Sequence, residues 1–149
     1  MAFRFGLEAV LKYRKRLEEI AQKDFAEAQA AAGACLREIE SMYQRMDEVR
    51  EEIRRAAEIG TAQKLEEIRA MEQFLEGQKI RVERQRLKAR ELMAVAEEKQ
   101  EALTAAVREM KVLVKLKEKR LNEHREWIAR VEAKTLDDLT MVREARRRR

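Results

Sequence analysis

The chain has 149 residues, of which 42% are charged and only 5% aromatic, with four glycines and no proline. This composition is typical of long helices or coiled coil and argues against a globular domain built from packed layers. The single cysteine, Cys35, excludes an internal disulfide and a cysteine-rich zinc site. No apolar run of about 18 residues and no signal-peptide pattern is present, so we expect a cytoplasmic protein without membrane insertion.

The formal net charge of +5 is concentrated at the C-terminus. The tail 143–149 has five arginines and one glutamate and supplies +4 of that charge, so the rest of the chain is nearly balanced. Two basic blocks remain, at Lys79–Arg90 and Lys111–Arg120. Such blocks are most often solvated helix faces, and a docking surface for an acidic partner is the alternative.

The first predicted helix covers about residues 3–59. Its apolar side chains recur at alternating intervals of three and four residues, which is the spacing of a coiled-coil seam. The same spacing extends upstream, with one stutter and one polar interruption, through Leu7, Val10, Arg14, Leu17 and Ala21. The regular part of the seam comprises Phe25, Ala28, Ala32, Cys35, Ile39, Met42, Met46, Val49, Ile53 and Ala56.

A turn is predicted at residues 60–61. Gly60 suits the left-handed position just after a helix, and the hydroxyl of Thr61 can cap the amides of the next helix. So short a connection makes the two helices antiparallel neighbours. Gly77 has no capping residue after it, and we interpret it as a weak point inside the second helix; a turn there would instead make the two arms nearly equal.

The second predicted helix covers about residues 62–143 and is followed by the basic tail 143–149. Its seam, weakened by two glutamines and one lysine, comprises Ile68, Met71, Leu75, Gln78, Val82, Gln85, Ala89, Leu92, Ala96, Lys99, Leu103, Ala106, Met110 and Leu113. Pairing about the turn places residue i opposite roughly residue 121 − i, so the alanine-rich Ala26–Ala34 faces Leu87–Val95. The expected fold is all-α: a long antiparallel two-helix coiled-coil hairpin over residues 1–149, with a longer C-terminal helix.

The unequal arms leave Leu121–Arg149 without an intramolecular partner. This overhang keeps apolar residues and the only tryptophan, Trp127. An isolated helix has little use for an apolar stripe, so we expect the overhang to pack against another protein.

Catalytic patterns are absent from the sequence. It has one histidine, His124, no phosphate-binding glycine loop, no nucleophile elbow and no metal-ligand spacing. Acidic pairs such as Glu51-Glu52 lack a pocket that could tune their pKa values. We therefore expect no enzyme activity, no cofactor and no metal. The basic blocks lack interleaved aromatic residues, which disfavours nucleic-acid binding.

Three stretches resemble a known family: "FRFGLEAVLKYRKRLEEIAQKDFAEA" from Phe3, "AMEQFLEGQKIRVERQR" from Ala70 and "LVKLKEKRLNEHREWIARVEAKTLDDLTMVR" from Leu113. Together they resemble the flagellar export protein FliJ over nearly the whole chain. The resemblance implies a soluble stalk-like component of the flagellar type III export apparatus, associated peripherally with the inner-membrane flagellar base. Its implied partners are the hexameric export ATPase, the membrane export-gate protein and export chaperones.

The resemblance also suggests which residues make these contacts. Candidates for the ATPase ring are Lys115, Lys117, Lys119, Arg120, Trp127, Glu132, Lys134, Asp137 and Asp138. Candidates for the export gate are Met42, Tyr43, Met46, Phe74 and Leu75. The alternatives are the equivalent protein of an injectisome, a generic coiled-coil scaffold and, less favoured, a basic nucleic-acid-binding hairpin. A rotary-ATPase stalk subunit is disfavoured because no additional domain separates the arms.

Overall fold

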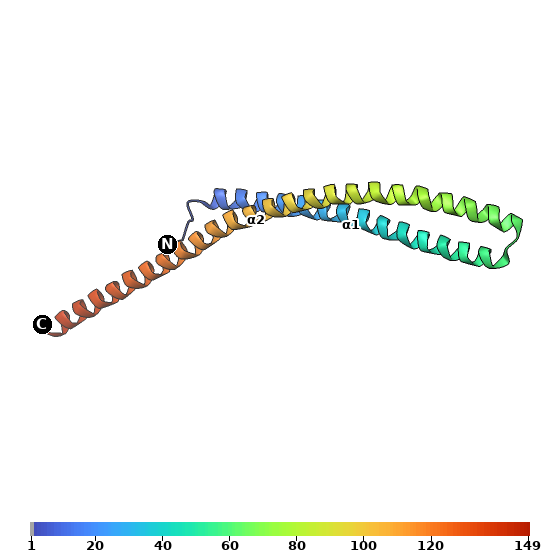
Figure 1. Cartoon of the computed structure of the whole chain (residues 1–149). Coiled ribbons are helices and arrows are strands. Elements are labelled where there is room, and N and C mark those ends of the chain that lie inside the picture. Colours follow the sequence, from blue (N-terminus) through green and yellow to red (C-terminus); the bar gives the residue numbers. More distant parts are fainter. Residues whose placement is uncertain (1) are drawn as a thin grey trace. The chain divides into compact units, whose positions relative to one another are not determined.

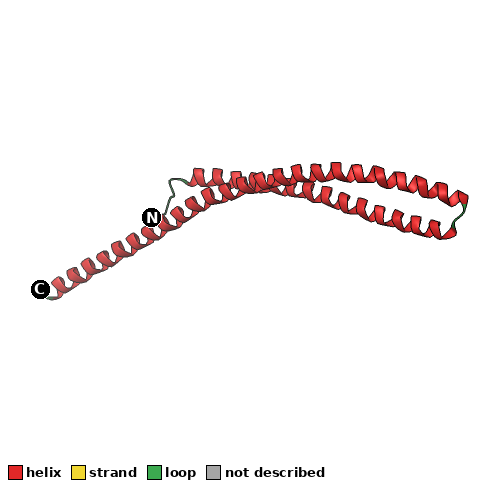
Figure 2. Ribbon diagram, viewed as in Figure 1, coloured by secondary structure: helices red, strands yellow, loops and turns green. Residues whose placement is uncertain are grey.

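A computed structural model describes residues 2–149, which form two long helices and no strand (Figures 1 and 2). Helix α1 spans Glu8–Ile59 and helix α2 spans Ala62–Arg147. The predicted all-α fold with a longer C-terminal helix is therefore confirmed. The chain divides into two compact units. We call Ile20–Leu103 the hairpin unit, and residues 2–19 with Thr104–Arg149 the terminal unit.

In the hairpin unit, Gly60 and Thr61 connect the two helices, which run side by side in opposite directions (Figure 1). Gly60 has a φ of 68°, a conformation open to glycine but costly for other residues, and its amide donates to the carbonyl of Ala56. The hydroxyl oxygen of Thr61 accepts a hydrogen bond from the amide of Lys64 at 3.3 Å. The glycine thus ends α1, and the threonine caps α2.

A continuous apolar seam holds the hairpin unit together. Every seam residue expected between Phe25 and Ala56 is buried or half-buried. The thiol of Cys35 lies 3.5 Å from the backbone oxygen of Gln85, one residue from the position that pairing about the turn assigns to it. The fully buried cluster consists of Cys35, Ile39, Met46, Val49, Leu75, Val82 and Ala89.

Polar seam positions behave in different ways. Gln78 is 7% exposed, and its side-chain oxygen accepts a hydrogen bond from Arg81 at 3.1 Å. Lys99 is exposed, so the expected seam is interrupted there. Gly77 lies inside α2. A buried glutamine costs little when its polar atoms are bonded, whereas a lysine ammonium favours water.

The terminal unit begins with a non-helical segment, residues 2–7, ahead of α1. The first helix was expected from about residue 3, but Gly6 is a poor helix former and Phe5 is buried outside the helix. The amide of Glu8 donates to the carbonyl of Phe5 at 3.1 Å, which starts the first turn. Leu11, 1% exposed, is the seam residue here, and the prediction of Val10, 41% exposed, was wrong.

The C-terminal end of α2 also differs from expectation. The helix continues to Arg147, beyond the expected end at about residue 143. Arg146 and Arg147 lie in its last turn, where cations interact favourably with the helix dipole. Most of the basic tail is therefore helical.

Candidate partner-binding surfaces

The N-terminal segment Ala2–Leu7, which we call the clasp, packs against α2 in the terminal unit. Phe5 is 8% exposed, and the guanidinium carbon of Arg120 lies 5.8 Å from the centre of its ring. The ring of Phe3 lies 5.5 Å from that of His124, which stacks on Trp127 at 5.9 Å. Burial of Phe5, the ring contact of the half-buried Phe3 and one cation–π contact attach this non-helical segment to the helix.

An ion pair extends this attachment to the start of α1. Lys117 Nζ lies 2.8 Å from Glu8 Oε2, and the hydrogen bond from Lys117 lowers the pKa of the Glu8 carboxyl group. Further along α1, Arg14 is paired with Glu109. The contacts of the clasp correct one expectation, because Leu121, His124 and Ile128 are half-buried. The uncovered part of α2 therefore begins after Ile128 and not at Leu121.

Every residue of the C-terminal segment Ala129–Arg149 is exposed. The half-buried face of α2 at Leu121, His124 and Ile128 continues into this segment at steps of three or four residues, which keeps side chains on one face. Exposed apolar residues of the segment are Val131 (40%), Leu136 (64%), Leu139 (52%), Met141 (70%) and Val142 (50%). Three of them, Val131, Leu139 and Val142, lie on the continued face together with Thr135.

The residues predicted to contact the ATPase ring fall into two groups. Lys117, Arg120 and Trp127 already contact the clasp, Glu8 or His124. Six others are exposed on α2: Lys115, Lys119, Glu132, Lys134, Asp137 and Asp138. The sequence did not indicate that Phe3, Phe5 and His124 would form the contacts of the clasp, although the paired phenylalanines at its start were part of the family resemblance.

The residues predicted to contact the export gate are not all on the surface. Met46 and Leu75 belong to the buried cluster, and Met42 packs partly against it. Tyr43 is 42% exposed and Phe74 is 36% exposed. The two aromatic side chains are therefore the members of this set that a partner could reach without separating the helices.

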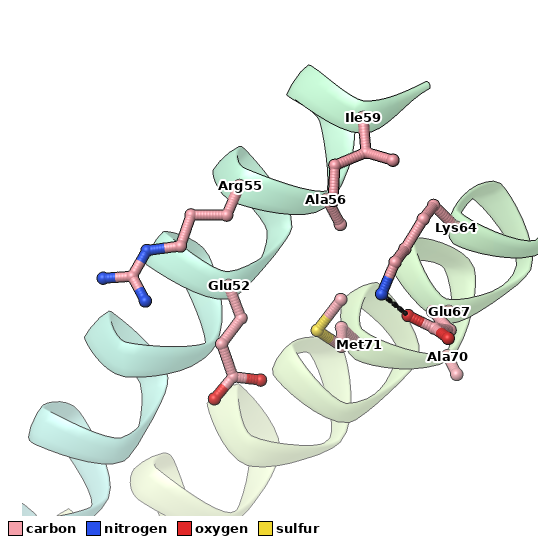
Figure 3. Close-up of a pocket in the computed structure, with 8 residues that line it drawn as sticks. All are labelled: Glu52, Arg55, Ala56, Ile59, Lys64, Glu67, Ala70 and Met71. Carbon is pink, nitrogen blue, oxygen red and sulfur yellow. Dashed lines mark hydrogen bonds and ion pairs between the residues drawn. The ribbon is translucent and has the colours of Figure 1, made fainter. Parts of the chain in front are cut away.

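A shallow groove next to the turn was not predicted. Ala56 and Ile59 of α1 and Met71 of α2 point toward the space between the helices, while Arg55 points away from it (Figure 3). Lys64 at its edge is paired with Glu67 at 2.9 Å (Figure 3). Whether a groove forms between two helices depends on which side chains meet across the seam. The spacing of apolar residues in the sequence does not show which side chains meet.

Within residues 2–149, no group of three or more histidine, cysteine, aspartate or glutamate side chains is arranged to hold a metal ion. In the same part of the chain, neither helix contains a stretch apolar enough to cross a membrane. Both findings refer to sites formed by residues of this chain alone.

Comparison with known protein families identifies the family of this chain. The family model described as Flagellar FliJ protein matches residues 3–149. Neither the curated proteins nor the solved structures give a significant match. The matched residues include both helices and the clasp from Phe3 onward. The chain therefore belongs to the FliJ family and is a component of the flagellar protein export apparatus.

Proposed function

We propose that the terminal unit binds the hexameric export ATPase, promotes assembly of its ring and raises its rate of ATP hydrolysis. In this proposal the protein acts in the cytoplasm at the inner-membrane flagellar base and performs no chemistry itself. The ATPase carries all nucleotide chemistry. Membership of a flagellar family favours this apparatus over an injectisome.

The observation that carries the proposal is the exposed C-terminal segment. From Ala129 onward every side chain is exposed, and Leu139 (52%) and Val142 (50%) continue the apolar face of α2 without a covering partner among the described residues. Exposed apolar residues on a helix with one established packing face are typical of a surface that a partner covers.

Charge on the same segment suits a ring of identical subunits. Glu132, Asp137 and Asp138 alternate with Lys134 and the arginines near the C-terminus. A single helix inside a six-fold ring presents different charges to different subunits, so its contacts are necessarily unequal around the ring. We propose that this inequality couples ATP turnover to the rest of the apparatus.

Deletion of residues 129–149 tests the ATPase contact. The truncated chain retains every half-buried residue of the terminal unit up to Ile128 and is expected to stay folded, but to lose stimulation of the purified ATPase. A matched pair is Leu139→Asp, which should reduce stimulation, and Leu87→Asp in the hairpin unit, which should not; the two leucines are 52% and 58% exposed. Full stimulation by the truncated chain would contradict the proposal.

We further propose that Tyr43 and Phe74 contact the export gate, and that chaperones bind elsewhere on the protein. The double variant Tyr43→Ala, Phe74→Ala should weaken binding to the gate protein, measured by pull-down with the purified partner. Both side chains are exposed, so helicity by circular dichroism should not fall. Unchanged gate binding would remove these two residues from the contact.

A further inference from the structure

A second groove lies in the hairpin unit, away from the residues assigned to the ATPase and the gate. Phe25, Gly33 and Leu36 of α1 line it from one side, and Arg90, Met93 and Glu97 of α2 line it from the other. Leu36 is 46% exposed and Met93 is 51% exposed. The lining is thus apolar at its centre and open to solvent.

Packing within the chain does not require the glycine in this groove. A methyl group at Gly33 would approach only the guanidinium end of Arg37, at 3.3 Å, and no backbone atom of α2. Glycine inside a helix is destabilising relative to alanine. Gly33 therefore leaves the bottom of the groove without a side chain, and this absence is not needed for the contact between α1 and α2.

The two ends of the groove carry opposite charge. Because the helices are antiparallel, Arg90 lies nearer the Leu36 end than Glu97 does, and Glu97 lies toward the Phe25 end. Arg37 follows Leu36 on α1, and its guanidinium lies 3.3 Å from the position that a methyl group on Gly33 would take. Among the described residues, no oppositely charged group lies within ion-pair distance of Arg37, Arg90 or Glu97. These charges are free to interact with a ligand.

We propose that this groove binds an amphipathic helix of another protein, with acidic side chains over Arg37 and Arg90 and a basic side chain over Glu97. From Phe25 to Leu36 the groove extends roughly 16 Å, which matches three turns of a helix. Apolar residues spaced as i, i+4 and i+7 would lie against Leu36, Gly33 and Met93 in that order. The polarity of the groove fixes the direction of the bound helix.

A second copy of this chain fits the groove less well. In a two-fold contact the same surface meets itself, and a concave surface cannot fill a concave surface. Three helical turns also cover less than the roughly 1,200 Å² that a stable interface buries. A short helix of another protein is convex and needs only a small contact area, with apolar side chains in the groove and a charged side chain at each end.

The probe is a fluorescent peptide of about 14 residues, with glutamates in its first turn, lysines in its last turn and leucines spaced as i, i+4 and i+7. We expect saturable binding to the full chain in a fluorescence anisotropy titration. Gly33→Leu should weaken that binding about ten-fold or more by filling the groove. Gly77→Leu is the matched control, since Gly77 is also helical with open space around it, and it should bind the peptide like the unaltered chain.

Arg90→Glu supplies an independent test that leaves the apolar lining intact. It should weaken binding of the glutamate peptide and restore binding of a peptide whose glutamates are replaced by lysines. Absence of peptide binding would overturn the proposal, as would equal effects of Gly33→Leu and Gly77→Leu. The assay contains no ATPase, so its outcome is independent of the function proposed for the terminal unit.

Discussion

Glu8 and Lys117 join the first turn of α1 to α2, with 2.8 Å between Glu8 Oε2 and Lys117 Nζ. The pair lies beside the clasp, where Phe5 contacts Arg120. It therefore links the start of α1, directly after the clasp, to the helix that carries the exposed C-terminal segment.

Acidification should loosen the clasp through this pair. The pKa of Glu8 is lowered in the folded chain, so its stabilising effect is fully present above the ordinary glutamate pKa of about 4.3 and is lost as pH falls through the lowered value. Fluorescence of Trp127, which stacks on His124, should report a change below about pH 4. In Glu8→Gln this change should be reduced, and an identical profile in both chains would contradict the assignment.

Leu11 and Val10 should differ sharply in their effect on stability. Leu11 is 1% exposed, so Leu11→Ala should lower the free energy of unfolding by about 2–5 kcal/mol. Val10 is 41% exposed, so Val10→Ala should cost less than about 1 kcal/mol. Urea denaturation followed by circular dichroism measures both losses. A larger loss for Val10→Ala than for Leu11→Ala would show that Val10, and not Leu11, is the seam residue.

Two glycines should respond to alanine in opposite directions. Gly60→Ala places a side chain at a φ of 68° and should cost about 1–2 kcal/mol. Gly77→Ala meets no atom within 4 Å on a helix and should gain up to about 1 kcal/mol. Thermal unfolding should therefore move to lower temperature for the first variant and to higher temperature for the second.

Gln78→Leu should stabilise the hairpin unit. Gln78 is 7% exposed in an otherwise apolar cluster, and its side-chain oxygen accepts a hydrogen bond from the exposed Arg81. Leucine has a similar size and leaves no buried polar atom, so we expect a gain of about 0.5–1.5 kcal/mol in urea denaturation. Arg81→Ala is the control, since a loss of stability in that variant would show that the hydrogen bond matters more than the apolar contact.

The sequence predicts the hairpin seam well because a coiled coil repeats one local rule. Residues from Phe25 to Ala56 alternate at three and four positions, and that spacing alone identifies a buried face. Gly60 and Thr61 add turn chemistry that depends on only a few neighbouring atoms.

The same rule fails at the chain ends. Val10 and Leu11 are adjacent apolar residues, and a stutter shifts which of them faces the partner helix. The clasp has no period, so its contacts with His124 and Arg120 could not be deduced from spacing. Among the gate candidates, Met46 and Leu75 follow the seam and are buried, which family resemblance by itself does not reveal.

The labelling rate of Cys35 can measure how often the hairpin opens. Its side chain is 5% exposed, and its sulfur lies between the helices, 3.5 Å from Gln85. A thiol reagent can reach it only while α1 and α2 are apart, so the rate of labelling under native conditions counts how often the hairpin opens. Because the chain has a single cysteine, the labelling rate reports on one known position, and no cysteine has to be added by mutation.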